Sequence, residues 1–513
     1  MAPRLDHAHH AASQTEFMML DRMEITDRLD AFARAGRALE ADASTRDALW
    51  AMTHAVARRY VEDVDTLPAF TTHTGREPVP PIGPGAMSIH AVRRYLEGEI
   101  FHGGASPSAP GHFAYLTGGG LFHAALGDYL AAATNAYSGM AQTGPGLVQL
   151  ENAMVRWTAD LVGYPDTAGG YLASGGSLAI LSAIAAAREA HGLRAADYHR
   201  AVVYLTEQTN PVMDKALRVA GMAEAIIRRV AMDERHRMRP DALSQAIQAD
   251  REAGLLPWMV APTAGTTDTG AIDPIAPLSD IAREAGCWLH VDAAYGGFFL
   301  LTDEGRRRMS GIERSDSVIL NPHKSLFLPW GLGILLVRET RFLLPPHDLT
   351  GACLQDAANQ ASLSPGELSP ELSRPFRALR MWLPLALLGT DPFRAALEEK
   401  LLLARYFHQR IAEAGFEVGP APDLSVVAFR RAPAGASAEE ADRLNEAIVD
   451  RLQRDGRVFL SSTRIDGRFT IRLAVLGYRT HRAQVDLAIQ LLRDAADALE
   501  PGTRAPTSAA NPP

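Results

Sequence analysis

Between residues 201 and 321, short apolar segments alternate with segments of helical spacing. AVVYLT and EAIIRRVAM have the apolar, branched composition of strands, and the helical segment PVMDKALRVAG separates them. A further helix begins at Pro240-Asp241, where proline suits the first helical position. WMVAPTAG, WLHVDAA and SVILN are the next strand candidates. Because strands that alternate with helices form mostly parallel sheets covered on both faces, this pattern predicts an α/β fold.

A second α/β pattern follows near the C-terminal end. Asp391-Pro392 begins a long amphipathic helix, with a capping residue before a proline. Ser437-Ala-Glu-Glu440 forms a capping box, and LSVVAF, VFLSS and FTIRLAV are strand candidates before a last helix from Thr480. We therefore predict four parts: an N-terminal arm at 1–110, a large domain at 111–385, a small C-terminal domain at 386–500, and a disordered tail at 501–513.

The composition excludes several classes of protein. The chain has 513 residues, of which 47% are hydrophobic and 22% charged, as in soluble globular proteins. A net charge of -9 without a basic block argues against a nucleic-acid binder. We find no apolar run of membrane-spanning length and no signal peptide, and two cysteines give no disulfide framework. We therefore expect a cytoplasmic protein without nucleic-acid or membrane partners. His7, His9 and His10 are more typical of a disordered terminus than of a metal site, so we expect no metal.

Polar residues follow the predicted strands at the edge where ligands of such sheets bind. Thr266, Asp292 and Asn321 all fall beyond the carboxyl ends of strands. Asp292 could pair with a protonated pyridinium nitrogen, and Lys324, thirty-two positions later in NPHKS, could form a Schiff base. Taken singly, such an aspartate is usually a cap or turn residue and such a lysine is usually solvated. Together they are the two groups that a protein supplies to pyridoxal 5'-phosphate, and the pair predicts that cofactor.

A glycine-rich turn offers a site for the phosphate group. Ser174-Gly175-Gly176-Ser177 precedes the Ala/Leu-rich helix LAILSAIAAAREA. Such a turn presents free N–H groups and the positive end of the helix dipole to an anion. A flexible turn with a serine cap is the alternative. Beside the Asp292–Lys324 pair, the phosphate site is the favoured interpretation.

Several motifs resemble those of the group II pyridoxal-phosphate-dependent decarboxylases, which include aromatic amino acid, glutamate and cysteine sulfinate decarboxylases. They are FAYLTGGG, LASGGSLAILSAI, APTAGTTDTGAIDPI, HVDAAYGG, NPHKS and RPFRALRMW, and the resemblance runs from about Gly111 to Arg472. It implies the fold type I architecture of aspartate aminotransferase, an amino acid substrate, and a homodimer with active sites at the interface. It implies cofactor contacts for these residues: Gly176, Ser177, Thr267, Asp292, Ala294, Asn321, His323 and Lys324.

Candidate substrate residues are fewer. Phe113 and Tyr115, with Leu116, would give the pocket an aromatic wall that suits an aromatic substrate, although core positions are an equal alternative. Arg472 in FTIRLAV could bind a substrate carboxylate, although an arginine on an exposed strand face is commoner. An aromatic L-amino acid is the favoured substrate, but no sequence feature excludes an acidic one.

The chain departs from the family pattern at two places. Asn210, in TEQTN, stands where the family usually has a histidine that stacks on the cofactor ring, and asparagine is neither acid nor base near neutral pH. Between Tyr295 and Tyr406 the chain has no tyrosine, whereas decarboxylating relatives carry one in the polar loop that corresponds to residues 347–371. Cys353 or another group could replace this acid.

These departures leave two hypotheses for the reaction. In the first, which is the common chemistry of the family, the enzyme releases carbon dioxide and an amine, with Lys324, Asp292, Asn210 and His323 as catalytic residues. In the alternative, oxygen oxidises the carbanion before it is protonated, and the enzyme is an oxidative decarboxylase-deaminase, or aldehyde synthase. The family's aldehyde synthases lack either the stacking histidine or the loop tyrosine, and this chain lacks both.

Overall fold

The computed structural model describes residues 22–72, 77–101, 103–348 and 363–500, which fall into two compact units. The first unit comprises residues up to 63 together with 75–102. It contains α2 (Arg22–Gly36), η1 (Arg37–Leu39), α3 (Ala43–Asp63), α4 (Ile89–Tyr95) and η2 (Leu96–Ile100). The amphipathic segment expected at 45–63 is α3, and none of its side chains is buried.

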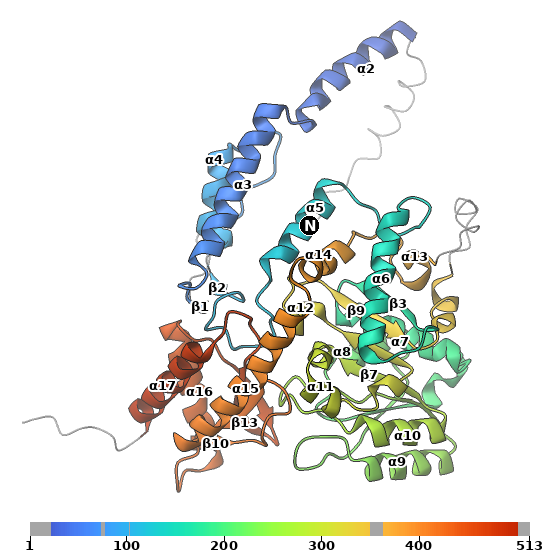
Figure 1. Ribbon diagram of the computed structural model, residues 1–513, viewed down its shortest axis with the longest axis vertical. Helices are drawn as coiled ribbons and strands as arrows, with labels where there is room; N and C mark the ends of the chain where they lie inside the picture. Colours follow the sequence, from blue (N-terminus) through green and yellow to red (C-terminus); the bar gives the residue numbers. More distant parts are fainter. Residues whose placement is uncertain (1–21, 73–76, 102, 349–362, 501–513) are drawn as a thin grey trace, which may run out of the picture. The chain divides into compact units, whose positions relative to one another are not determined.

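A seven-stranded sheet organises the second unit (Figure 1). Its order is β3-β9-β8-β7-β6-β4-β5, and β9 runs antiparallel to both of its neighbours whereas the remaining pairs are parallel. The prediction of a mostly parallel α/β sheet is confirmed. The strands are β3 (Gly169–Ala173), β4 (Ala201–Leu205), β5 (Ile226–Arg229), β6 (Leu256–Val260), β7 (Trp288–Ala293), β8 (Ser317–Leu320) and β9 (Gly333–Val337).

Helices cover both faces of this sheet. Along β4, Val202 and Tyr204 belong to one buried hydrophobic cluster, whereas Val203 and Leu205 belong to another. The first cluster includes residues of α6, α9 and α10, and the second includes residues of α7 and α8. Side chains of a strand point alternately to opposite faces, so each cluster is the core of one face. The bounds are α6 (Pro145–Val162), α7 (Gly176–Ala190), α8 (Val212–Val219), α9 (Pro240–Glu252) and α10 (Ile275–Ala285).

An antiparallel sheet of four strands lies in the C-terminal part, in the order β10-β11-β13-β12. Its strands are β10 (Glu417–Val418), β11 (Val426–Arg430), β12 (Ser461–Ile465) and β13 (Arg468–Ala474), and its helices are α15 (Asp391–Glu413), α16 (Ala438–Asp455) and α17 (Arg482–Leu499). The capping box of Ser437 and Glu440 is present. The strand expected from VFLSS begins only at Ser461, because pairing with β13 starts there. The domain boundaries at 110, 385 and 500 stay predictions.

Shorter elements complete the second unit. They are β1 (Phe70–Thr71), β2 (Gly104–Ala105), α5 (Phe122–Ala133), η3 (Ala195–Arg200), η4 (Gly297–Leu301), α11 (Asp303–Arg308), η5 (Ile312–Arg314), α12 (Pro322–Ser325), η6 (Thr340–Phe342), η7 (Pro345–His347), α13 (Pro365–Leu368) and α14 (Ala378–Leu388). Among the helices of the described residues, none is both long and apolar enough to cross a membrane.

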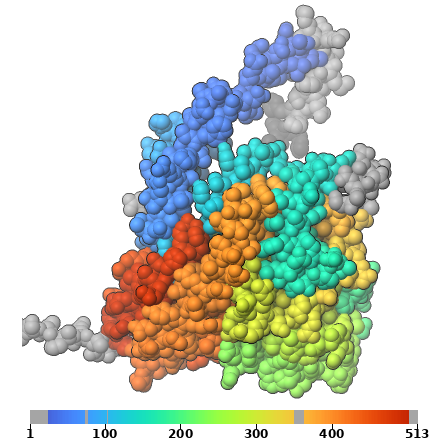
Figure 2. All heavy atoms as spheres, in the orientation of Figure 1, coloured from blue at the N-terminus to red at the C-terminus, as the bar shows by residue number. Residues whose placement is uncertain are grey.

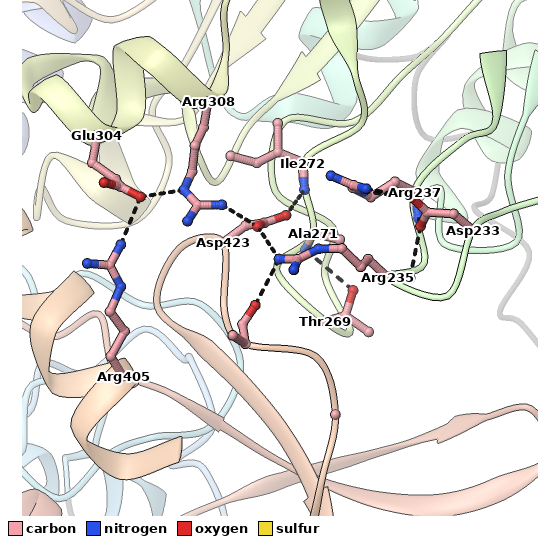
Figure 3. Close-up of polar contacts among 12 residues, drawn as sticks. Asp233, Arg235, Arg237, Thr269, Ala271, Ile272, Glu304, Arg308, Arg405 and Asp423 are labelled. Carbon is pink, nitrogen blue, oxygen red and sulfur yellow. Dashed lines mark hydrogen bonds and ion pairs between the residues drawn. The ribbon is translucent and has the colours of Figure 1, made fainter. Parts of the chain in front are cut away.

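The two sheets of the second unit are joined by packing and by charge. In the space-filling view, the orange atoms of the C-terminal part lie directly against the green and yellow atoms of the seven-stranded part, and α15 contacts η4 (Figure 2). Asp423, just before β11, accepts hydrogen bonds from Arg308, from Arg235 at 2.9 Å and from the Ile272 N–H at 3.1 Å (Figure 3). The four-stranded sheet therefore has a fixed place beside the strand ends of the seven-stranded one.

Candidate active site

A cavity of about 250 Å³ opens beyond the carboxyl ends of β7 and β8. Its lining includes all nine residues that the sequence proposes for catalysis or cofactor binding, namely Gly176, Ser177, Asn210, Thr267, Asp292, Ala294, Asn321, His323 and Lys324. These residues come from five separate segments between α7 and α12. The structure thus brings the proposed set together at the edge where α/β sheets bind ligands.

Asp292 lies near the end of β7 and is buried. One carboxylate oxygen, Oδ1, accepts a hydrogen bond from the Ala294 N–H at 3.0 Å. Burial raises the pKa of Asp292, while the Ala294 N–H and the charge of Lys324 act against that rise. A buried carboxylate with only one such bond favours a cationic partner in the cavity.

Lys324 lies on α12, the single helical turn that follows β8. Burial lowers the pKa of Lys324, nearby Asp292 opposes this, and Arg472 lowers it further. A lowered pKa increases the share of free amine, which is the nucleophilic form. The chain has only three lysines, and the other two do not line the cavity: Lys215 is exposed, and Lys400 is buried against Glu399 and the Thr480 carbonyl.

The glycine-rich turn also lines the cavity, through Gly175, Gly176 and Ser177. Helix α7 begins at Gly176, so the backbone N–H groups of its first turn have no partner within the helix. A Cβ atom on Gly176 would lie only 3.0 Å from Nδ2 of Asn321, and one on Gly333 would lie 2.6 Å from the carbonyl carbon of Gly175. The turn therefore packs tightly against Asn321 and β9, and it leaves room for an anion beside free donors.

Asn210 is held in a fixed orientation. Its Nδ2 donates to Oγ1 of Thr267 at 3.0 Å, and its Oδ1 accepts from the Val212 N–H at 3.0 Å. Both polar ends of the amide are therefore occupied by neighbours. The side chain can present its flat face to a ligand in the cavity, but it can neither deliver nor accept a proton at neutral pH.

His323 is neutral at physiological pH. Its Nδ1 lies 2.5 Å from the carbonyl oxygen of Leu332, and its ring centroid is 5.0 Å from that of Trp330. Burial lowers the pKa of His323 to about 4. Because the carbonyl can only accept, the ring proton is on Nδ1, and Nε2 remains as a hydrogen-bond acceptor.

The three proposed substrate residues do not line this cavity, and their roles in substrate binding stay predictions. Phe113 is fully buried in the core of the C-terminal part, with Phe407 and Phe429. Arg472 is 3% exposed and bonds to the carbonyl oxygens of Thr267 and Asp268 and to Ser461. Its guanidinium is therefore occupied within the protein, and it does not lie on an exposed strand face either.

Tyr115 differs from the other two. It is 59% exposed and has a positive φ of 57°, which is strained for a residue with a side chain. It does not line the cavity. A role in substrate binding stays a prediction for this residue.

Sequence reasoning missed Tyr295, which lines the cavity. Its hydroxyl contacts Oγ of Ser425 at 2.6 Å and accepts from the Ser425 N–H at 2.8 Å, so it also links β7 to the C-terminal part. Its place in HVDAAYGG, three residues after Asp292, was the available signal. Thr263 and Gly265 were missed in the same way, within APTAGTT.

The candidate proton donors lie elsewhere. Cys353 and most of the loop, residues 349–362, lie outside the described residues. His347 lines a separate cavity of about 330 Å³ with Ser182 and Pro370, and burial lowers its pKa to about 4. Within the described residues, no acid from the loop reaches the cavity of Lys324.

The α/β fold, the Asp292–Lys324 pair and the turn before α7 define an enzyme of fold type I that uses pyridoxal phosphate. The lining fits this cofactor because a buried carboxylate, a lysine and the N-terminal residues of a helix all line one cavity. Comparison with known proteins identifies the family. Residues 89–432 match the model of the pyridoxal-dependent decarboxylase conserved domain, and the chain belongs to that family.

Individual relatives agree with this assignment. The chain is 33% identical over 396 residues to an aromatic-L-amino-acid decarboxylase of Bacillus atrophaeus, covering 76% of this chain and 81% of the relative. It is 28% identical over 419 residues to a phenylacetaldehyde synthase of Arabidopsis thaliana, covering 79% and 85%. The crystal structure of Oryza sativa TDC with PLP and tryptamine superposes with a TM-score of 0.84 at 26% identity, covering 90% of this chain and 99% of that one. The protein is therefore a pyridoxal-phosphate-dependent decarboxylase, a lyase.

Proposed function

We propose that the enzyme removes the carboxylate of an aromatic L-amino acid and releases carbon dioxide and the corresponding amine. The observation that carries the proposal is the meeting of Asp292 and Lys324 in one cavity, each with a pKa moved by burial. When bound, pyridoxal phosphate supplies an electron sink for the bond to the carboxylate.

The residues of the chain take distinct roles in this proposal. Asp292 holds a proton on the ring nitrogen of the cofactor through a charge-assisted hydrogen bond. Lys324 would hold the cofactor through Nζ, and its free amine would supply a nucleophile beside it. Ser177, Gly176 and the first N–H groups of α7 hold the phosphate. Ala294 and Asn321 lie on the same lining, and His323 stays neutral.

Two observations support an aromatic substrate: what similar proteins act on or bind, and the charged residues in the cavity lining. The Bacillus atrophaeus relative is an aromatic-L-amino-acid decarboxylase, and the Oryza sativa structure holds tryptamine. Among the described residues that line the cavity, Lys324 is the only Lys or Arg, because Arg472 is bonded elsewhere. A substrate with a second carboxylate would therefore have no free cation to bind it.

The oxidative reaction is the second candidate, and Asn210 favours it. With no proton donor at this position and no tyrosine between Tyr295 and Tyr406, protonation of the substrate carbon is slowed. Oxygen can then accept the electrons, so that amino acid, oxygen and water give aldehyde, ammonia, carbon dioxide and hydrogen peroxide. The similarity to a phenylacetaldehyde synthase supports keeping this candidate.

One experiment tests both candidates. Purified enzyme is incubated in air with tryptophan, tyrosine, phenylalanine, dopa and glutamate, and carbon dioxide, amine, aldehyde, oxygen uptake and peroxide are measured together. Amine equal to carbon dioxide supports the first candidate, whereas aldehyde and oxygen uptake equal to carbon dioxide support the second. Release of carbon dioxide from glutamate alone would contradict the aromatic substrate.

We also propose that the enzyme is a homodimer. In the first unit, Leu29, Phe32, Leu39 and Trp50 are large apolar residues that are exposed in the single chain. In the second unit, Phe122, Leu126, Tyr129 and Leu130 form an exposed stripe along α5. Apolar surfaces of this kind mark protein–protein contacts. Sedimentation equilibrium tests this, and a monomer at micromolar concentration would contradict it.

A cytoplasmic location is proposed as well. Cys287 is a free, buried thiol, which is typical of proteins from a reducing compartment. Fractionation of cells that express the tagged protein tests the location. Recovery in a secreted or membrane fraction would contradict it.

A further inference from the structure

Strand β3 leads directly into the turn Ser174–Ser177, and it is an edge strand of the seven-stranded sheet. An edge strand has one row of backbone groups without a neighbouring strand. At Leu172, charged side chains take the place of that neighbour. The Leu172 N–H donates to Oε1 of Glu151 at 3.0 Å, and the Leu172 carbonyl accepts from Arg374 and from Nη1 of Arg377 at 3.2 Å.

Glu151 and Arg374 form a fully buried ion pair. Their atoms Oε1 and Nη1 are 2.7 Å apart, and both side chains are 0% exposed. Burial raises the pKa of Glu151, while Arg374 and the Leu172 N–H oppose the rise. Because the desolvation of two charges offsets most of their attraction, such a pair adds little net stability. Breaking it from one side leaves a buried charge without compensation.

The pair also acts on the far side of the turn. The Arg374 guanidinium lies 5.8 Å from the ring centroid of Tyr171, the residue before Leu172. The Tyr171 hydroxyl bonds to Oγ of Ser182 at 2.7 Å, and Ser182 belongs to α7, which begins at Gly176. Elements α6, β3 and α7 lie close together (Figure 1). The strand before the turn and the helix after it are therefore tied to one buried pair.

Neither member of the pair lines the cavity of Lys324. They can affect a ligand in that cavity only indirectly, because they contact Leu172 and Tyr171 in the strand that precedes the turn. Close packing makes the turn sensitive to a displacement of β3, since a Cβ atom added to Gly176 would meet Asn321 and one added to Gly333 would meet Gly175.

We propose that Glu151 and Arg374 are positioning residues that set the Ser174–Ser177 turn for the phosphate group of the cofactor. The inference rests on the proposed function, in which this turn binds the phosphate. It adds a physical cause for the geometry of the turn. This cause is the ion pair between Glu151 of α6 and Arg374, which precedes α14.

The test separates the phosphate from the rest of the cofactor. Cofactor is removed from the holoenzyme, and the dissociation constants of pyridoxal phosphate and of pyridoxal, which lacks the phosphate, are measured for wild type and for Glu151→Gln. Glutamine keeps the shape and the acceptor for Leu172 but leaves Arg374 unpaired. We expect pyridoxal phosphate to bind about 10- to 100-fold more weakly, and pyridoxal to change by less than about 2-fold.

A matched control comes from another buried charge. Asp250 on α9 accepts from the Tyr204 hydroxyl at 3.0 Å and pairs with Arg228, far along the sheet from β3. Asp250→Asn is expected to lower thermal stability while the ratio of the two dissociation constants stays as in wild type. A purely structural role of Glu151 would give this same result for Glu151→Gln.

Two further variants keep the test decisive. If Glu151→Gln does not fold, the double variant Glu151→Gln/Arg374→Gln removes both charges together, and the dissociation constant of pyridoxal phosphate is expected to rise relative to that of pyridoxal in this variant too. Arg374→Lys keeps the charge but has a single point of donation, so an intermediate ratio is expected. An unchanged ratio in these variants overturns the inference. A wild-type protein that binds neither compound through Lys324 contradicts the proposed function instead, so the two failures are distinguishable.

Discussion

Two hollows of this protein, the groove beside Asp423 and the cavity of Lys324, differ in how fully their carboxylates are hydrogen-bonded within the protein. The groove beside Asp423 has a volume of about 540 Å³ and is the larger, but the carboxylates of Asp423 and Asp233 are matched by donors within the protein (Figure 3). Asp423 accepts from three donors, and Asp233 accepts from Arg237 and from two N–H groups of its own turn. In the cavity of about 250 Å³, Asp292 has one hydrogen bond, and the pKa values of Asp292, His323 and Lys324 are all moved by burial. Volume alone would favour the groove, whereas a buried acid and a buried lysine with shifted pKa values identify the smaller cavity as the functional one.

The largest expected effect is that of Lys324→Ala. Without the amine, the cofactor has no covalent attachment and the reaction no returning nucleophile, so carbon dioxide release should fall at least about 1000-fold, or about 4 kcal/mol. The measurement is single-turnover release of carbon dioxide at saturating cofactor. Lys215→Ala is the matched control, since Lys215 is exposed and outside the cavity. Full turnover in Lys324→Ala would mean that the functional hollow has been misidentified.

Acid should destabilise the core behind the cavity. Burial lowers the pKa of His290, on β7, to about 4 from its ordinary value of 6.5. The folded state then binds fewer protons than the unfolded state between these values, so the free energy of unfolding falls as the pH drops from 6.5 to 4. The loss is roughly 3 kcal/mol for His290, and buried Asp273, with its pKa raised to about 6, acts in the opposite direction.

Urea unfolding at several pH values measures this dependence. In the variant His290→Gln, the free energy of unfolding should change less as the pH drops from 6.5 to 4, because the contribution of His290 is removed. A His290→Gln variant with the same pH dependence of stability as wild type would contradict the burial of a neutral histidine there.

Asp292→Asn should have the next largest effect. The asparagine cannot hold a positive charge on the ring nitrogen, so turnover should fall on the order of 100-fold, about 2.7 kcal/mol, while cofactor binding falls only partly. Steady-state rates and cofactor titration give the two numbers. Near-normal turnover in this variant would mean that buried Asp292 is not needed for catalysis. Its burial would then not mark the smaller cavity as the functional one.

The groove should respond in stability and not in catalysis. Asp423→Ala leaves Arg235 and Arg308 without their shared carboxylate, so the free energy of unfolding should fall by about 2 kcal/mol. Turnover per folded enzyme should change by less than about 2-fold at saturating substrate. Denaturant unfolding and rates at a temperature well below the transition test this together. A large loss of turnover with unchanged stability would assign the groove a direct function.

Asn210→His should have the smallest effect on rate and act on the product. A histidine can exchange protons at physiological pH, so the ratio of amine to aldehyde should rise roughly 10-fold if the wild type follows the oxidative reaction. The measurement is oxygen uptake against carbon dioxide release. A wild type that gives only amine would leave the ordinary decarboxylase, and Cys353 and His347 would be the next acids to replace.

Much of the fold could be predicted because strands β4 to β8 are short apolar runs bounded by turn residues and helices. Strand β9 could not be placed, because periodicity does not tell the direction of a buried strand such as GILLV. The same limit applies to side chains. The nine cavity residues follow strand ends or begin helices, and their place follows from sheet geometry. The carbonyl groups of Thr267 and Asp268, to which Arg472 donates, lie more than 200 residues away in the chain, so no local pattern could reveal that its guanidinium is already bonded to them.

The most direct test of the account is the site of covalent attachment. The holoenzyme is treated with borohydride, which makes the link between cofactor and lysine permanent, and its peptides are mapped by mass spectrometry. The chain offers only Lys215, Lys324 and Lys400, so the assignment is unambiguous. The account predicts one label per chain, on Lys324, in the smaller cavity. A label on Lys215 or Lys400, or no label in an enzyme that still releases carbon dioxide, would contradict it.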